Sequence, residues 1–147
     1  MANSFDIVRA ALATLFATMT GMSSETVHER VPQGLQDFPC MLLLPFEGEN
    51  EYESFGGDEL NKTHRIRGVV LSAPTSDLAQ RDAELTPFID RVPDVLRTSP
   101  DLGLGTVIAQ PVTATPYKFV DFVYNSVNHF AVEWTIEATY YDDLTGD

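Results

Sequence analysis

The last third of the chain alternates between apolar and polar residues, and this pattern limits the possible folds more than any other feature. From Phe130 to Tyr140 every second residue is apolar or aromatic, and the positions between them include Glu133 and Glu137. A repeat of two residues is that of a β-strand with one buried and one solvated face. The pattern therefore predicts a long strand whose inner face contributes to the core, with Glu133 and Glu137 solvated on the outer face.

Other segments have strand character because they are short, rich in β-branched or aromatic residues and bounded by turn residues. The segments predicted as strands are 27–31, 38–44, 65–72, 106–112, 117–124 and 130–141. Residues 125–128 are predicted to join the last two as a four-residue hairpin loop. In segment 38–44 both alternating sets are apolar, which predicts a central strand with both faces covered. Gly68 predicts a bulge or a close approach between backbones.

Apolar residues recur at spacings of three and four between residues 5 and 19, which predicts an amphipathic helix. Ser4 is its predicted N-cap, and Gly21 its predicted end. The side opposite the apolar stripe carries small residues such as Ala13 and Ala17 instead of the usual Lys and Glu. Either a loop of the same chain covers this side, or it lies against a neighbouring subunit.

A second helical pattern runs from residue 76 to about residue 98, with Leu78 at the start of its apolar stripe. Thr86 followed by Pro87 predicts an N-cap and a first helical position, which divides the segment into two helices, although one kinked helix is also compatible. Pro93 falls inside the second half, so we expect a bend in the preceding turn.

Segment 47–59 is the one compositional anomaly, because it contains six acidic residues and no basic one. Its glycines and its charge predict a long mobile hairpin or loop. A solvated linker has little use for aromatic residues, so Tyr52 and Phe55 favour a role in an interface. The polar C-terminal tail 142–147 is predicted to be frayed.

The length of 147 residues fits one domain with one core. The predicted order is helix, strands, helix pair, strands. This order favours a single α+β domain, residues 1–147, in which a helix pair lies on a largely antiparallel or mixed sheet.

Composition excludes several classes of function. A net charge of −13 argues against a protein whose main task is to bind nucleic acid phosphates. A single cysteine, Cys40, allows no intrachain disulfide and no multi-cysteine zinc site, and in its apolar segment it reads as a buried hydrophobe. The longest apolar run, residues 41–44, is far too short to cross a bilayer, so we expect no membrane association.

No pattern of catalytic or metal-binding residues is present. His28, His64 and His129 are far apart and lack a metal-ligand spacing, so they are interpreted as surface or hairpin histidines without a role. The glycines of 103–106 follow a helix and precede a strand, which is the reverse of a phosphate-binding loop. We therefore expect no enzymatic activity, no cofactor and no metal.

Four features together resemble a known family. They are the N-terminal helix 4–9, the acidic insertion after the second strand, the helix segment 85–92 with its Thr-Pro pair, and the closing Phe-Ala-Val-Glu-Trp strand 130–134. In size and hydrophobic pattern they are similar to the tail terminator, or tail-completion, proteins of long-tailed, siphovirus-like phages. The resemblance covers most of the chain and contains no signature residue.

The resemblance implies a virion structural protein that forms a ring, expected to be a hexamer, at the head–tail junction. Such a ring caps the tail tube, ends its polymerisation and contacts the head-completion or neck protein. It is assembled in the host cytoplasm, has no catalytic residues, and lets DNA pass through its channel without specific binding. The alternatives are another neck or tail-tube structural protein, or a small α+β ligand-binding domain or enzyme.

Interfaces between subunits are expected where apolar or small residues lack a partner within the chain. In segment 117–124, Phe119 and Val123 share one side, whereas Val120, Phe122 and Tyr124 share the other. The candidate interface residues are Ala13, Ala17, Tyr52, Phe55, Phe119 and Phe122. Acidic residues of segment 47–59 or of the tail at 142–143 are expected to line the channel.

Overall fold

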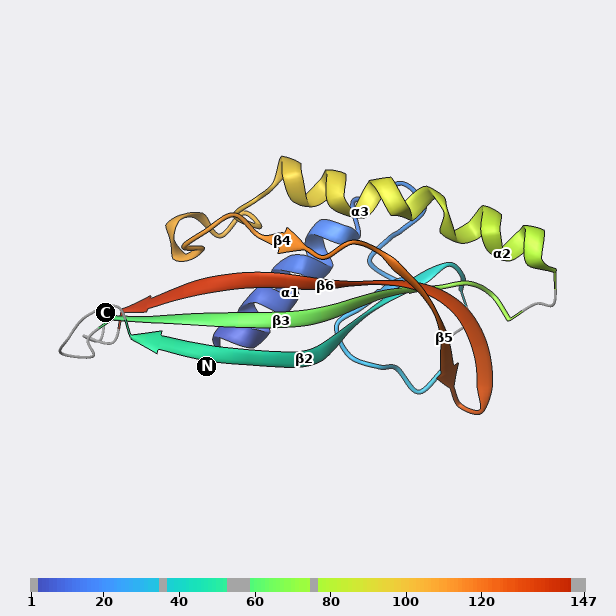
Figure 1. Ribbon diagram of the computed structural model, residues 1–147, viewed down its shortest axis with the longest axis horizontal. Helices are drawn as coiled ribbons and strands as arrows, with labels where there is room; N and C mark the ends of the chain where they lie inside the picture. The colour runs from blue at the N-terminus through green and yellow to red at the C-terminus, as the bar shows by residue number, and fades with distance from the viewer. Residues whose placement is uncertain (1–2, 35–36, 53–58, 75–76, 144–147) are drawn as a thin grey trace.

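A twisted sheet of six strands forms the centre of the computed structural model, which describes residues 3–34, 37–52, 59–74 and 77–143 (Figure 1). In chain order the elements are α1 (Ser4–Phe16), β1 (Val27–His28), β2 (Cys40–Tyr52), β3 (Glu59–Leu71), α2 (Leu78–Leu85), α3 (Pro87–Thr98), the 3₁₀ turn η1 (Gly105–Val107), β4 (Thr113–Ala114), β5 (Lys118–Tyr124) and β6 (Val127–Asp143). The helices pack on the sheet. The predicted fold class, a single α+β domain, is thus confirmed.

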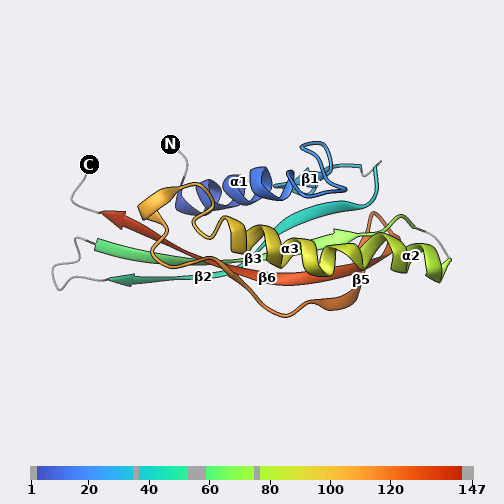
Figure 2. The ribbon, with the colours of Figure 1, turned by 90° about the horizontal axis from the view of Figure 1, so that it is seen from above.

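The strand order is β1-β2-β3-β6-β4, and β5 also pairs with β6. Among the described strands only β1 and β2 run parallel, and the other pairs are antiparallel. The long strand β6 pairs with β3 along one edge, from Ala131 to Asp143, and with β5 and then β4 along the other. The sheet therefore has β1 at one margin and the β4 and β5 segments at the opposite margin (Figure 2).

The larger hydrophobic core lies between the helices and one face of the sheet. Phe16 of α1 and Phe88 of α3 are almost completely buried against Ile136 and Trp134 of β6, together with residues of β2 and β3. Phe130 and Tyr140 of the alternating stripe are partly buried and pack against this core, whereas its four inner members are buried. The predicted inner face of β6 is therefore confirmed.

The opposite face of the sheet has a smaller core. Its buried residues are Cys40, Leu42, Val69, Leu71 and Ala131. The hairpin of β5 and β6 and the segment that precedes β2 contribute the partly buried Phe38, Val120 and Phe122 to it. Met41 and Leu43 are buried on the helix side, so both faces of β2 are covered, as the apolar alternation in 38–44 predicts.

The first helix begins and ends at other residues than the sequence indicates. Asn3, and not Ser4, is the N-cap, because the Asn3 side chain accepts a hydrogen bond from the backbone N–H of Asp6. The helix ends at Phe16, and Gly21 lies in the following turn with a φ of 91°. Asn3 and Ser4 both have short side chains with an acceptor oxygen, so the local pattern could not separate them as the N-cap.

The helical segment after residue 77 is divided at Thr86, as the Thr-Pro pair predicts, with Pro87 at the start of α3 and Pro93 inside it. Thr86 makes no N-cap hydrogen bond, however, and its hydroxyl donates to the carbonyl of Asp82 in the preceding helix. The prediction that Leu78 belongs to the buried stripe is wrong, since this side chain is 72% exposed.

Two predictions for the last third of the chain are wrong in detail. Segment 106–112 is not a strand, because it contains η1 and then a single bridge between Ile108 and Tyr140. The hairpin loop has two residues, Asn125 and Ser126, both with positive φ, so Val127 already belongs to β6. This backbone geometry suits the twist of paired strands and makes the loop shorter than predicted.

Segment 47–59 is largely strand. Residues 47–52 continue β2 and pair with residues 60–65 of β3. Residues 59–65 of β3 pair in turn with residues 137–143 of β6. For residues 47–52 the prediction of a loop is wrong and the alternative of a hairpin is confirmed. Residues 53–58 lie outside the described part of the chain. The prediction of a frayed tail is wrong for 142–143, which pair with Leu60 and Glu59. These three strands extend together away from the helices, toward one end of the elongated molecule (Figure 1).

Gly68 marks a close approach, not a bulge. A Cβ atom there would lie 3.0 Å from both the Cδ1 atom of Ile136 and the Cε atom of Met41. The irregularity of the ladder is instead between Pro45 and Glu47 of β2.

Candidate interaction surfaces

The described residues contain no group of three or more His, Cys, Asp or Glu side chains that could hold a metal ion. His129 is 3% exposed and its ring stacks on Phe38. Its Nδ1 atom donates a hydrogen bond of 3.0 Å to the carbonyl oxygen of Ser72. The interpretation of His129 as a surface residue is therefore wrong, whereas the alternative of a hairpin histidine is confirmed, because His129 pairs with Phe122 in the β5–β6 hairpin. The residue that covers it comes from a distant segment, which local sequence does not reveal.

His64 connects the start of α1 to the sheet. Its Nε2 atom lies 2.8 Å from the hydroxyl oxygen of Ser4, and its ring contacts the edge of Phe5. Burial, assisted by the positive charge of Lys62, lowers the pKa of His64 below its ordinary value of 6.5. Ser4 is buried and the pair lines none of the cavities described below, so it holds the helix in place and offers no access for a substrate.

Cys40 is fully buried, and burial raises the pKa of its thiol to about 12. A reactive cysteine needs a lowered pKa and access to solvent. The thiol of Cys40 has neither, which agrees with its interpretation as a small buried hydrophobe.

The open face of the sheet carries ion pairs beside the smaller core. Arg65 Nε lies 2.9 Å from a carboxylate oxygen of Glu137, and Arg67 pairs with Glu133. The guanidinium of Arg67 also lies over the ring of Phe122, at 5.8 Å from its centroid. Glu133 and Glu137 lie on the outer face of β6, as predicted, and each also has a cationic partner on the neighbouring strand. The side chain of Glu137 is 45% exposed and thus solvated, whereas that of Glu133, at 18%, is mostly covered.

An exposed row of aromatic rings lies on the β5–β6 hairpin. Phe119 is 39% exposed and stacks on Phe130 with ring centroids 5.5 Å apart, and Tyr117, 47% exposed, contacts the edge of Phe119. The guanidinium of Arg81 on α2 lies over Phe130 at 6.0 Å from the ring centroid. With the exposed Val123, which shares the side of Phe119, we name these five residues the aromatic strip: Arg81, Tyr117, Phe119, Val123 and Phe130.

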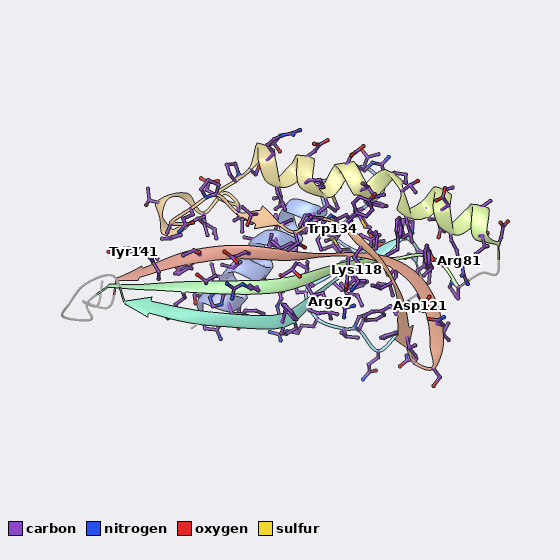
Figure 3. The ribbon with its side chains drawn as sticks, in the orientation of Figure 1. Arg67, Arg81, Lys118, Asp121, Trp134 and Tyr141 are labelled. Atoms are coloured by element: carbon purple, nitrogen blue, oxygen red, sulfur yellow. The ribbon has the colours of Figure 1, made fainter. Side chains whose placement is uncertain are left out.

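Exposed apolar residues gather at this end of the molecule. Of the seven large hydrophobic side chains that are exposed in the described residues, four lie in or beside the β5–β6 hairpin and a fifth, Leu78, lies on α2. Figure 3 shows Arg81 and Asp121 at this end, far from Tyr141 near the tip of the three extended strands. A gathering of this kind is a candidate contact surface.

Phe122, the other candidate on β5, lies on the opposite side of the strand. It is partly buried against the smaller core, so it belongs to the packing of the sheet more than to an exposed surface. The predicted division of residues 119–124 between two sides of the strand is confirmed by these contacts.

Ala13 and Ala17 border a depression on the outer side of α1, at the β1 margin of the sheet. The cavity has a volume of about 340 Å³ and is lined by Ala13, Thr14, Ala17, Ser24, Val27 and Glu29. We name it the α1 depression. The two alanines are half-buried and pack against the larger core, so a loop of the same chain covers this side in part and leaves a recess beside it.

Tyr52 and Phe55 are the last two candidate interface residues. Tyr52 is the final residue of β2, and Phe55 lies outside the described residues. Nothing in the structure tests their role in an interface. Sequence reasoning missed Arg81 and Tyr117, because a single arginine in a polar helix and a tyrosine before a strand carry no signal until the fold brings them to Phe119 and Phe130.

Among the other cavities in the described part of the chain, one of about 350 Å³ beside β4 is lined by Arg65 and Glu137, which pair with each other. Another of about 330 Å³ between α3 and the segment before β4 is lined mainly by Pro93, Leu96, Pro100, Pro111 and Val112. Its volume is at the low end for small-molecule sites. Arg97 is the one charged residue that lines it, and its lining contains no candidate catalytic acid, base or nucleophile.

Comparison of the chain with models of known protein families, and with curated proteins, finds no match in either case. Among the helices of the described residues, none has the length and apolar character needed to span a membrane.

Proposed function

We propose that this chain is a structural subunit of a phage tail, a terminator or completion protein that forms a ring at the end of the tail tube. The observation that carries the proposal is the aromatic strip, an exposed row of rings beside a sheet margin. A monomeric protein rarely keeps such a surface uncovered. The family resemblance of the sequence supplies the kind of assembly, and the α+β fold agrees with it.

The shape of the molecule supports a role in assembly. The sheet is stiffened by helices on one face and by a second core on the other, and its two margins are different in sequence and structure. Unlike margins favour head-to-tail contacts, which close into a ring when the rotation between neighbours allows it. In this role the ring stops tube growth and contacts the head or neck.

The charge of the chain agrees with a channel that DNA traverses. At −13 per subunit, a surface lining the channel repels phosphate within about 8 Å at physiological salt. Which acidic residues line the channel is part of the proposal, with Glu47, Glu59, Asp142 and Asp143 on the extended strands as its first candidates.

The experiment measures the mass of the purified protein alone and with tail tubes of a long-tailed phage. We expect a ring-sized species by light scattering, and rings at tube ends by electron microscopy. The matched specimen is the same tube preparation without the protein. A protein that stays monomeric at all concentrations, leaves tube ends bare and binds a small molecule in its proline-lined cavity would contradict the proposal in favour of a ligand-binding domain.

A further inference from the structure

The tip of the β5–β6 hairpin extends beyond the rest of the sheet. Strand β3 pairs with β6 from Asp143 back to Ala131, so the preceding residues of β6 have β5 as their one described partner strand. No described strand pairs with the outer edge of β5. Figure 1 shows the hairpin curving away from β3 at this end of the molecule. We name residues 121–128 the overhang, because they lie outside the ladder of the other strands.

Buried hydrogen bonds fix the base of the overhang. The backbone N–H and the hydroxyl of Ser72 donate to the carbonyl oxygen of Phe130, at 2.9 and 3.0 Å. The Nδ1 atom of His129 donates to the carbonyl oxygen of Ser72, and the ring of His129 stacks on Phe38. Ser72 and His129 are buried, so water does not compete for these bonds. The base is therefore an anchor about which the overhang can turn.

Two hydrogen bonds hold the tip of the overhang. The hydroxyl of Tyr124 donates to the carbonyl oxygen of Pro32, and the Nδ2 atom of Asn125 donates to that of Gln33 at 3.0 Å. Both acceptors lie in the segment before β2, 92 residues away in the sequence. Asn125 is exposed and Tyr124 is partly buried, so water can replace both bonds when the tip moves. We name Tyr124 and Asn125 the latch.

Little apolar surface joins the overhang to the rest of the domain. Phe122 is the residue of the overhang that packs on the smaller core, and the guanidinium of Arg67 lies over its ring. Val123 and Val127 are 68% and 42% exposed. A segment with a free edge, few buried side chains and solvent-accessible hydrogen bonds opens at a lower free energy than the whole domain unfolds.

We propose that the overhang is a strap that opens and closes over the smaller core, turning at Ser72 and Phe130 and held shut by the latch. Opening lifts Phe122 and uncovers buried apolar residues of the smaller core such as Cys40 and Leu42, while the larger core stays folded. The fold thus holds an apolar surface in reserve, which another molecule can contact only when the strap is open. This inference concerns a single chain and does not depend on the proposed function.

Cys40 is a natural probe of the strap, since it is the single cysteine of the chain and is fully buried in the smaller core. Burial raises the pKa of its thiol to about 12, so a thiol reagent modifies Cys40 only in molecules where it has reached solvent. The experiment measures the rate at which dithionitrobenzoate labels the natural chain at mildly alkaline pH in increasing urea. Opening of the strap exposes little surface, so we expect a rate nearly independent of urea below the unfolding transition. A natural chain that is labelled only as it unfolds globally, with the full urea dependence of unfolding, overturns the proposal.

Two substitutions test the latch. Tyr124→Phe removes one hydroxyl, and Asn125→Asp replaces the donor amide by a carboxylate of similar shape that also tolerates the φ of 49° at this position. The double variant should label about tenfold faster than the natural chain, because the open strap no longer has to give up these two hydrogen bonds. Asn128→Asp is the matched control, since it adds the same charge to an exposed position of the overhang outside the latch. It should label at the natural rate.

Val92→Ala separates opening of the strap from unfolding of the domain. Val92 is fully buried in the larger core on α3, so this variant lowers the stability of the domain and leaves the latch intact. We expect its labelling rate without urea to equal that of the natural chain. Faster labelling of V92A, or a natural rate in the latch double variant, overturns the proposal. Circular dichroism establishes that the variants are folded, and the urea series of the natural chain decides the proposal where one is not.

Discussion

The two faces of the sheet bury their residues in different ways. On one face the core extends along the sheet, and three helices supply its cover. On the other face five buried residues around Cys40 are covered by the curled β5–β6 hairpin and the segment before β2, and the rest of the face carries ion pairs. The larger core is thus formed between helices and sheet, whereas the smaller core is covered by the hairpin that also carries the aromatic strip.

This difference connects stability to assembly. Because the β5–β6 hairpin covers the smaller core with Val120 and Phe122 and exposes Phe119 and Val123 on its other side, the smaller core fixes the position of the proposed contact surface. A change in the helix-side core should therefore act on the whole domain, and a change around Cys40 should act first on the hairpin.

The largest expected effect comes from the helix-side core. Phe88 is 1% exposed, so Phe88→Ala leaves a cavity and should lower the free energy of unfolding by about 3–5 kcal/mol. Denaturant unfolding followed by circular dichroism measures it. Ile89→Ala, one position along the same helix and half-buried, is the matched control and should cost less. Equal losses for the two variants would mean that Phe88 is not a central core residue.

The next effect concerns the smaller core. Cys40→Ser places a hydroxyl at a fully buried position and should cost about 1–3 kcal/mol, more than Cys40→Ala, because the hydroxyl loses its bonds to water. Hydrogen exchange should show the additional opening in residues 118–131 before it appears in α3. The comparison of the two faces fails if the exchange of α3 increases equally.

The outline of the fold could be predicted from the sequence because it rests on local periodicity. The alternation in 130–140, the apolar faces of 38–44 and the Thr-Pro division of the second helical segment all follow from side chains that repeat along one element. The segment 106–112 misled this reasoning. Its Thr, Val and Ile residues favour a strand, but Gly105 has a φ of 74° and the chain turns there into η1.

The candidate surfaces were predictable only in part, for a physical reason. Phe119 and Ala13 could be identified because one strand or one helix places them, whereas the strip also needs Arg81 from α2 and Phe130 from β6. His129 could not be recognised as buried, since Phe38 covers it from a segment about 90 residues away in sequence. Contacts between distant segments are set by the packed fold and leave no local pattern.

A smaller effect should appear as a dependence of stability on pH at the helix side. The pKa of His64 is lowered in the folded state, so the unfolded chain binds more protons as the pH falls below about 6.5. The free energy of unfolding should therefore decrease as the pH falls from 7 through the lowered pKa of His64, and should be unaffected by this group above pH 7. Melting curves of the natural chain and of His64→Asn between pH 5 and pH 8 measure this. Burial also lowers the pKa of His28, which therefore contributes in the same direction in both proteins. If His64→Asn shows the same pH dependence as the natural chain, His64 is not the group responsible.

The smallest expected effect concerns the ion pairs of the open face. Arg67 and Glu133 are partly buried, with side-chain exposures of 34% and 18%, whereas Arg97 and Asp94 on α3 form a pair exposed at 78% and 56%. Solvent and salt screen exposed pairs more strongly, so a double-mutant cycle with alanine should give a coupling of about 0.5–1 kcal/mol for Arg67–Glu133 and less than about 0.5 kcal/mol for Arg97–Asp94. Denaturant unfolding at low and at high salt measures both cycles, and the coupling of the helix pair should decrease more with salt.

Because Arg67 also lies over Phe122, Arg67→Ala should loosen the β5–β6 hairpin, and Arg97→Ala should not. Equal couplings and an unaltered hairpin would show that the open face gains no stability from its charges, and that the smaller core alone positions the aromatic strip.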